Sequence, residues 1–589
     1  MTKVTGLVWR TWPLWPLLLV LLLLLVLPVG QLLAVSVLDQ QGKFTGAHYE
    51  SLIGSKTYLR ILTNTFELAA WTTLICIVLG YPVAYMLANA AGRSRSWLTL
   101  FVLLPFWTSF LVRTFAWIIM LSRKGVVNWG LGHFGISDPA PMIYNYTGVL
   151  IGMSHALMPI AILTMSSVME GIPRDLTKAA GTLGARRSQA FLRIYLPLSM
   201  PGVASAALMV FISALGFFIT PALLGGPRET MITQVIIDSV QTLLNWGLAS
   251  AIATLLLVST FVVFFLYDRL AGFSTLSGTE APRKPRHSSG PLSAMSRRFG
   301  KVLLAKLGIV LDALDDLFSR KGGRAKRSPT LFVVVAGLVL AFLVLPSLVV
   351  IPISFTESNF LEWPPQGFTL KWYQAYIESP LWLSATWRSL YVGLASAAIA
   401  TLIVAPAAFV LAKRRFPLRG AALALILAPM ILPRMIVALA LFYLYAQIGL
   451  VGSSIGLVLS HVVLATPYVV VTMMAVLKSH DERLEQAAGT LGAKPWQAIR
   501  RITIPLIRPG LISAFLFAFV TSFDELTVAL FVTGGLSATL PKQMWDDALL
   551  KVSPILAAVS TVILVTVTIA VFVGEFFRRQ TVQRTIGER

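Results

Sequence analysis

The chain has 589 residues, of which 56% are hydrophobic and only 12% charged, and its mean hydropathy is +0.78. This composition excludes a soluble globular protein and predicts a polytopic membrane protein. The net charge of +23 would indicate nucleic-acid binding in a soluble protein, but here the basic residues fall between apolar segments and report membrane topology. The single cysteine, Cys76, excludes a disulfide framework, a cysteine metal site and a redox pair.

Mainly apolar runs of about 18 residues or more, enough to cross ~30 Å of hydrocarbon, divide the chain into two sets of six. We expect an all-α fold of twelve transmembrane helices in two six-helix repeats, because period-two alternation is absent and a backbone in lipid must satisfy its own hydrogen bonds. In the first repeat, residues 1–273, the expected spans are 13–36, 64–90, 97–121, 147–169, 202–224 and 245–270. In the second repeat, residues 331–589, they are 330–354, 387–412, 420–446, 455–477, 511–533 and 553–577.

A basic linker, residues 274–330, separates the two repeats. It has Pro, Ser and Gly clusters and twelve Lys or Arg residues between Arg283 and Arg327, a composition that cannot fold alone. We expect a cytoplasmic tether. Within it, apolar residues from Leu303 to Phe318 recur at helical spacing. They predict an amphipathic helix that lies either on the inner leaflet or on the protein's own cytoplasmic surface.

Lysine and arginine residues fall on alternate sides of successive spans, which predicts that both termini are cytoplasmic. Arg123 and Lys124 break this pattern because they fall on the outer side. About eighteen extra residues lie there in the first repeat, within 124–147, and they predict a short hairpin or helix at the outer face.

Two polar, basic islands, residues 170–200 and 478–508, repeat nearly the same sequence 308 positions apart. Because the surrounding apolar segments differ while the islands agree, we expect both to dock a copy of the same partner. In each, small apolar residues follow the spacing of one helical face, from Leu176 to Leu183 in the first copy. Gly184 and Gly492 are expected to supply a left-handed turn after this short helix. The prolines that follow, Pro197 and Pro505, are expected to stop a second helix.

The pattern Ala179-Ala180, three residues, Gly184, nine residues, Ile194, any residue, Leu196-Pro197 resembles the signature loop of the membrane subunits of bacterial ATP-driven, binding-protein-dependent importers. The second island repeats it with Ile504 before the proline. Both copies lack the usual acidic residue before the alanines, which are preceded by Lys178 and Gln486.

Flanking motifs narrow the resemblance. The run 221–227, Pro-Ala-Leu-Leu-Gly-Gly-Pro, looks like the first permease of polyamine-type (spermidine/putrescine-like) importers, and 522–525, Ser-Phe-Asp-Glu, looks like the second. These permeases are usually separate chains, so this chain resembles a fusion of the two.

This resemblance implies the type I importer permease fold, a bacterial inner-membrane location, a periplasmic substrate-binding protein and two copies of an ABC ATPase subunit. The chain has no Gly-x-x-x-x-Gly-Lys-Ser/Thr motif, so ATP and Mg are expected on the ATPase partner, with no cofactor or catalysis in this chain. The lipid bilayer and a small-molecule substrate complete the expected partners, and no nucleic acid is among them. The implied ATPase-docking residues are Ala179, Ala180, Gly181, Gly184, Ala487, Ala488, Gly489 and Gly492.

Ionisable side chains inside the spans are candidate pathway residues, because each costs ~2.5–3.5 kcal/mol at the bilayer centre. Asp524 and Glu525 fall midway along the fifth span of the second repeat, so one carboxylate is expected to face the pathway while the other pairs with an arginine; a purely structural ion pair stays open. An acidic position of polyamine permeases is Phe217 here, which favours a zwitterionic or weakly cationic solute of the polyamine, opine or aminophosphonate kind. The candidate pathway residues are Arg113, Phe217, Arg434, Asp524 and Glu525.

No histidine pair has metal-ligand spacing, and the repeat-related His155 and His461 are expected to form helix–helix hydrogen bonds. A fused ferric-iron or thiamine importer is the alternative within transport, although the spans offer few tyrosines or carboxylates for iron. An ion-driven secondary transporter also has twelve helices in two repeats. It has no need of two matching docking islands, which therefore favour the ATP-driven importer.

Overall fold

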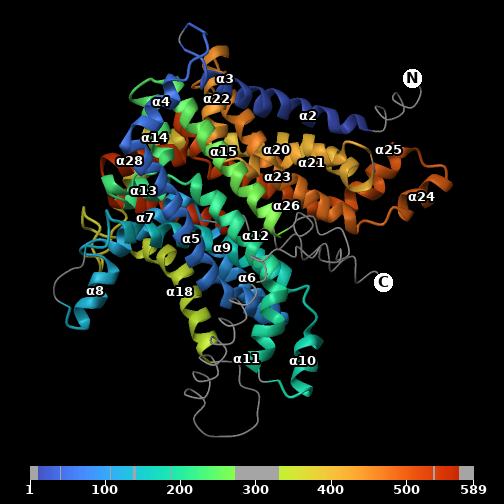
Figure 1. Cartoon of the computed structure of the whole chain (residues 1–589), viewed down its shortest axis with the longest axis horizontal. Helices are drawn as coiled ribbons and strands as arrows, with labels where there is room; N and C mark the ends of the chain where they lie inside the picture. The colour runs from blue at the N-terminus through green and yellow to red at the C-terminus, as the bar shows by residue number, and fades with distance from the viewer. Residues whose placement is uncertain are drawn as a thin grey trace.

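The computed structural model describes residues 11–39, 41–106, 108–136, 141–185, 187–271, 330–414, 416–534 and 537–569. These residues form an α-helical protein whose one β feature is an isolated bridge between Leu38 and Phe44 (Figure 1). The expected linker, apart from Thr330, lies outside the described residues, and so does its amphipathic helix. The all-α prediction is confirmed.

Each expected span has a helical counterpart in the described residues: nine long apolar helices, two helix pairs bent by 87° and 98°, and the shorter apolar helix Pro554–Ile569. The helices of the first half are α2 (Trp15–Leu21), α3 (Leu27–Val35), α4 (Ala47–Gly54), α5 (Lys56–Asn89), α6 (Gly92–Phe106), α7 (Phe110–Leu121), α8 (Val126–His133), α9 (Tyr146–Met169), α10 (Arg174–Thr182), α11 (Arg187–Ala190), α12 (Leu196–Leu215), α13 (Ile219–Leu224), α14 (Ile232–Gln241) and α15 (Trp246–Ala271). Those of the second half are α18 (Thr330–Ile353), α19 (Lys371–Glu378), α20 (Pro380–Lys413), α21 (Arg419–Ile431), α22 (Arg434–Ile448), α23 (Ser454–Ser479), α24 (Arg483–Thr490), α25 (Pro495–Ala498), α26 (Ile504–Phe523), α27 (Thr527–Val532) and α28 (Leu540–Leu550).

The third and fifth spans of both halves are broken, which corrects the expectation of single helices. The expected span 202–224 is α12 followed by the short α13, and 511–533 is α26 followed by the short α27. Likewise the chain bends by 87° between Gly92–Pro105 and Phe110–His133, and by 98° between α21 and α22. Hydropathy missed these breaks because the apolar run continues across them. Irregular backbone at this depth is tolerated where protein surrounds it or where it lines a cavity.

The second helix of each island does not stop at its proline, contrary to expectation. It continues into the membrane as one 28-residue helix, Ser188–Leu215, in the first half and as one 29-residue helix, Pro495–Phe523, in the second. A π-helical turn precedes each proline: Phe191–Tyr195 comes before Pro197, and Ile499–Thr503 comes before Pro505. This local change in hydrogen bonding accommodates the proline within a continuous helix. Each island is therefore continuous with the helix that ends at the break of the fifth span.

The two halves exchange their first helices. The N-terminal helix, α2 and α3, packs against α20 and α22 of the second half, whereas α18 packs against α5, α6 and α7 of the first (Figure 1). Leu17, Leu21, Leu25 and Leu32 are buried by the exchange, because they recur on one face of the helix. The halves are thus interlocked rather than merely adjacent.

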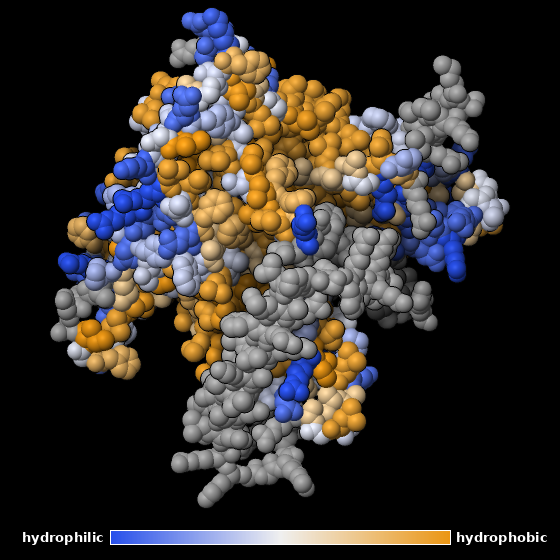
Figure 2. Space-filling view, in the orientation of Figure 1, coloured by the Kyte–Doolittle hydropathy of each residue, from blue (hydrophilic) through white to orange (hydrophobic). Residues whose placement is uncertain are grey.

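The outer segment of the first half contains α8, so the helix expected within 124–147 is present. Lys124, which breaks the charge rule, donates to Glu362 of the other half at 2.7 Å, and the Trp363 amide donates to the Lys124 carbonyl. This cation therefore has a contact between the halves that explains its position. Figure 2 shows an apolar belt between a polar end near α4 and α14 and another at α24.

Candidate functional site

The candidate pathway residues all lie at, or within one turn of, the four breaks in the third and fifth spans. Asp524 and Glu525 directly follow the end of α26, and Phe217 follows α12 in the same way. Arg434 is the first residue of α22, and Arg113 lies in the first turn of α7. Asp524 and Glu525 are therefore not midway along a helix, as expected from the apolar run, but in the irregular segment that joins α26 to α27.

Asp524 from the second half meets the start of α7 in the first half. Its carboxylate interacts with the Ser109 hydroxyl and with the Phe110 backbone amide, the N-cap and first residue of α7. A helix N-terminus stabilises an anion through its free N–H groups and its dipole. One oxygen, Oδ1, has no hydrogen-bond partner in the described structure.

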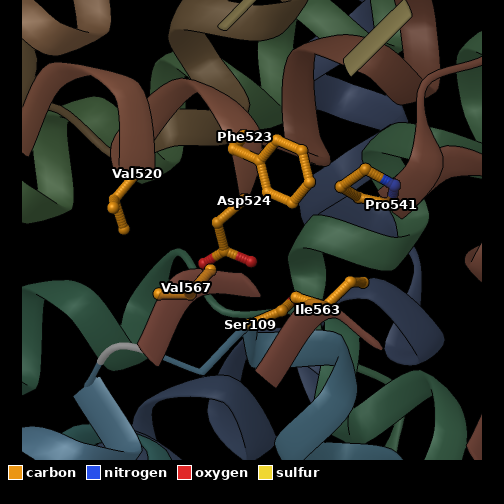
Figure 3. Close-up of a pocket in the computed structure, with 7 residues that line it drawn as sticks. All are labelled: Ser109, Val520, Phe523, Asp524, Pro541, Ile563 and Val567. Atoms are coloured by element: carbon orange, nitrogen blue, oxygen red, sulfur yellow. The ribbon is translucent and has the colours of Figure 1, made fainter. Parts of the chain in front are cut away.

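Asp524 also lines a small cavity between the two halves (Figure 3). Its space of about 10 Å³ has room for roughly one water molecule. The other lining residues are Ser109, Val520, Phe523, Pro541, Ile563 and Val567. Asp524 is the one ionisable residue among those that line this cavity.

Glu525 turns away from this cavity and caps α27. Its Oε2 accepts from the backbone amides of Val528 at 2.9 Å and Ala529 at 3.3 Å. The His461 Nε2 lies 3.7 Å from the same oxygen, and Glu525 is only 1% exposed. The two neighbouring carboxylates therefore have different surroundings: Asp524 faces a cavity, whereas Glu525 holds the start of a buried helix.

The two arginines contact neutral groups rather than the carboxylates. Arg113 is buried, donates to the Ala156 carbonyl at 3.0 Å and lies over the Phe110 ring at 4.2 Å. Arg434 is half-buried and donates to the Tyr468 hydroxyl at 3.3 Å. Both act electrostatically on Asp524, but neither forms an ion pair with Asp524 or Glu525 within the described structure. The arginine–carboxylate ion pair considered from the sequence is absent among these residues.

A pseudo-twofold relation links the breaks. Ser109 and Pro433 are equivalent positions 324 apart, and Gly216 and Asp524 are equivalent positions 308 apart. On one side Asp524 meets Ser109; on the other, a Cβ added to Gly216 would lie 3.1 Å from the Pro433 Cβ. Ser109 was not singled out from the sequence. The signal that points to it is a polar residue in an apolar run, at the position equivalent to a helix-breaking proline.

Phe217 makes apolar and backbone contacts at the break that follows α12. Its ring packs edge-on against Phe110 at 5.4 Å, and its backbone carbonyl accepts from the Thr233 hydroxyl of α14 at 2.8 Å. Phe217 is equivalent to Glu525, so the helix cap of the second half is replaced by aromatic packing in the first.

The repeat-related histidines form the expected helix–helix hydrogen bonds. His155 of α9 bonds to the Leu343 carbonyl of α18 at 3.1 Å, and His461 of α23 bonds to the Ser522 hydroxyl of α26 at 2.6 Å. No cluster of three or more His, Cys, Asp or Glu side chains suited to a metal occurs in the described ranges.

The two islands have the same geometry. After α10, Gly184 has φ +84°, and after α24, Gly492 has φ +85°, the left-handed conformation that the sequence predicts. In the first island the amides of Gly184 and Ala185 donate to the carbonyls of Gly181 and Ala180, and equivalent bonds close the second island. This double bond pattern is the Schellman motif.

No residue of α10 or α24 is buried. The residue before each left-handed glycine, Leu183 or Leu491, is 88% exposed. Each island therefore presents a short helix, a fixed turn and one projecting leucine, while the continuous helix behind it leads to the break at Gly216 or Asp524.

A family model described as "Binding-protein-dependent transport system inner membrane component" matches the chain twice, at residues 76–272 and 404–584. The spermidine/putrescine transport system permease protein PotB of Haemophilus influenzae is 34% identical over 245 residues, which cover 40% of this chain and 85% of that protein. PotC of Escherichia coli strain K12 is 31% identical over 251 residues, or 42% of this chain and 94% of that protein.

Among solved structures, a bacterial ABC transporter involved in the import of the acidic polysaccharide alginate is similar, with a TM-score of 0.41 and 21% identity over 47% of this chain and 100% of that one. The double match of the family model covers more than half of the sequence. The chain therefore belongs to the family of inner membrane components of binding-protein-dependent transport systems, as a multi-pass permease with two permease domains fused in one polypeptide.

Proposed function

We propose that this chain supplies the whole translocation pathway of an ATP-driven importer for a small, weakly cationic or zwitterionic organic solute. The observation that carries the proposal is Asp524, which lines a cavity between the halves and has one carboxylate oxygen without a hydrogen-bond partner among the described residues, at the end of the helix that begins in the second island. The cationic group of a solute would replace the missing partner of Asp524. An anionic group, where the solute has one, would face the half-buried Arg434.

The solute class follows from charge. The similar proteins PotB and PotC are named as spermidine/putrescine transport system permeases. This chain has Phe217 where such permeases carry an acidic residue, and Glu525 is engaged by its own helix. One carboxylate in the cavity wall and one half-buried arginine favour a solute with fewer positive charges than a polyamine, of the opine or aminophosphonate kind, delivered by a periplasmic binding protein.

The islands are the proposed docking sites for two copies of one ABC ATPase subunit, which would bind ATP and Mg. Their identical turns, exposed leucines and unburied helices support one partner used twice. Docking on the cytoplasmic side would also place both termini in the cytoplasm. No cofactor is proposed for this chain.

The test is ATP-dependent uptake by proteoliposomes that contain this chain, the ABC ATPase subunit that co-purifies with it and its periplasmic binding protein. Competition among spermidine, a dipolar amino-acid conjugate and an aminophosphonate identifies the solute class. Uptake of a zwitterionic or singly cationic solute, lost without ATP, supports the proposal. Preference for spermidine, or a binding protein that holds a metal ion, contradicts the solute class.

A further inference from the structure

Lys413 joins the last turn of α20 to the start of the second island. Its Nζ donates to the His480 carbonyl at 2.8 Å and lies 3.2 Å from Glu482 Oε1. His480 ends α23 and Glu482 is the N-cap of α24. A lysine at the end of the second span therefore holds the connection between α23, the fourth span, and the island helix α24.

The first half makes the same connection with the donor and acceptors exchanged. Arg174, the first residue of α10, donates to the carbonyls of Asn89 at 3.1 Å and Ala88 at 3.4 Å, at the end of α5. Asn89 is equivalent to Lys413, and Arg174 is equivalent to Glu482. The cation thus sits on the island helix in one half and on the second span in the other. The contact is retained although its chemistry is reversed.

A second repeated contact lies at the opposite end of α5 and α20. The Thr65 hydroxyl accepts from the Ile232 amide at 2.9 Å, and the equivalent Ser389 hydroxyl accepts from the Leu540 amide at 2.8 Å. Ile232 and Leu540 are the first residues of α14 and α28. The first amides of a helix have no partner within it, so each hydroxyl satisfies a free donor in a buried position.

These outer contacts adjoin the site. In α14, the residue after Ile232 is Thr233, whose hydroxyl binds the Phe217 carbonyl at the break. In α28, the residue after Leu540 is Pro541, which lines the Asp524 cavity. Each second span is an unbroken 34-residue helix, and the 24 residues between its two contacts span about 36 Å at 1.5 Å per residue.

We propose that α5 and α20 act as struts that transmit movement of the island helices to α14 and α28, and that Arg174 and Lys413 are the positioning residues that attach the struts to the islands. The inference rests on the proposed ATPase docking of α10 and α24. An ion pair with a half-exposed carboxylate such as Glu482 adds little to folding stability, so a purely structural explanation accounts poorly for a contact built twice.

A charge exchange tests the inner contact. Lys413→Glu places two carboxylates together, and Glu482→Lys places two cations together, whereas the double variant restores an opposite pair. In proteoliposomes with the ATPase and binding protein, we expect each single variant to import about five-fold less solute per ATP hydrolysed, and the double variant to recover most of the loss. The inference is overturned if the double variant is no better than the single variants, or if the single variants couple normally.

The other half supplies matched controls for the outer contact. Ser389→Thr copies the residue at Thr65 and keeps the acceptor, whereas Ser389→Ala removes it. We expect normal solute import per ATP for the first and a loss for the second. The same pattern is expected at Thr65, with normal import for Thr65→Ser and a loss for Thr65→Ala. Equal coupling of the alanine and hydroxyl variants overturns the strut.

The amount of ATPase that co-purifies separates the two levels of failure. If the wild-type chain retains no ATPase, both the docking proposal and the struts fail. If it retains two copies and every variant couples normally, docking stands and only the struts are wrong.

Discussion

The two sides of the molecular centre share a backbone design but differ in chemistry. Where the fifth span of the second half breaks, Asp524 meets the Ser109 hydroxyl and a cavity; where that of the first half breaks, Gly216 packs closely against Pro433, and an added Cβ would be in tight contact with it. Both breaks are retained, so the fold requires them. The carboxylate is present on one side only, which shows that a duplicated scaffold can keep its turns while one copy carries the charge.

The islands show the opposite pattern. Their helices, left-handed glycines and exposed leucines agree in both halves. This contrast agrees with the proposed function, in which the two halves would meet one asymmetric solute at the centre and two copies of the same partner at the islands. We call the central breaks the differentiated centre, because they differ between the halves, whereas the islands match. The following variants test this contrast.

The largest effect is expected from the double variant Gly184→Trp, Gly492→Trp. Both glycines have positive φ, which disfavours any side chain, while the space around them is open, so the turn is strained but insertion is not obstructed. We expect transport to fall by about 100-fold with normal membrane insertion. Gly420→Trp, in open space on α21, is the control. Wild-type, solute-stimulated ATP hydrolysis by the double variant would refute the role of the islands.

Asp524→Asn keeps the side-chain shape and removes the charge at the differentiated centre. We expect uptake to fall about ten-fold or more, because hydrogen bonds to a charged group contribute about 1.5–3 kcal/mol. Complex assembly should be unchanged, since no ion pair with Asp524 is broken. Uptake is normalised to folded complex, and Glu525→Gln is the comparison.

Glu525→Gln retains an oxygen that accepts from the Val528 and Ala529 amides. We expect a smaller transport defect than for Asp524→Asn, because Glu525 does not line the cavity. We also expect a lower folded yield, because a neutral amide stabilises the start of α27 less than a carboxylate does. Wild-type uptake by both variants, and by Arg434→Ala, would remove these residues from the pathway.

Gly216→Ala tests the closely packed side. The added methyl group would lie 3.1 Å from the Pro433 Cβ, so we expect a loss of about 1–3 kcal/mol in stability, measured as a lower thermal midpoint of the purified complex. Gly420→Ala has open space and should be neutral. An unchanged midpoint for Gly216→Ala would mean that the two sides are equally loose.

The smallest effect is expected from dividing the chain near Ser289 in the linker. The halves recognise each other through the exchanged first helices and the central breaks, so co-expressed halves should assemble and transport within about two-fold of the intact chain, since tethering mainly raises effective concentration. Assembly without transport would assign the linker an active role.

The sequence predicted the helical class, the span count and the island turns, because each depends on local patterns: apolar run length, or a glycine after a short helix. It failed where tertiary contacts decide. The apolar run around Asp524 hides the end of α26, and Pro505 is accommodated by a π turn instead of ending its helix. The partnership of Asp524 with Ser109 joins residues 415 positions apart, which no local pattern reports.

The struts also escaped the sequence, although the repeat contains their signal. Arg174 and Glu482 occupy equivalent positions with opposite charge, and so look unrelated in a comparison of the halves. Only the contacts with Asn89 and Lys413 show that the two residues hold the same joint.

Because the halves exchange their first helices, the N-terminal helix cannot complete its packing until much of the second half has been synthesised. Trp12–Val35 is synthesised before the partners that it packs against in the second half, which begin at Pro380 and Arg434, although α3 also packs against α15 of the first half. At ordinary synthesis rates this helix waits roughly 20 to 70 seconds or more before those partners leave the ribosome. Its mean hydropathy of 2.8 suits that wait, because a helix this apolar is stable in lipid before it finds a neighbour. This helix therefore completes its contacts only after most of the two halves has been synthesised.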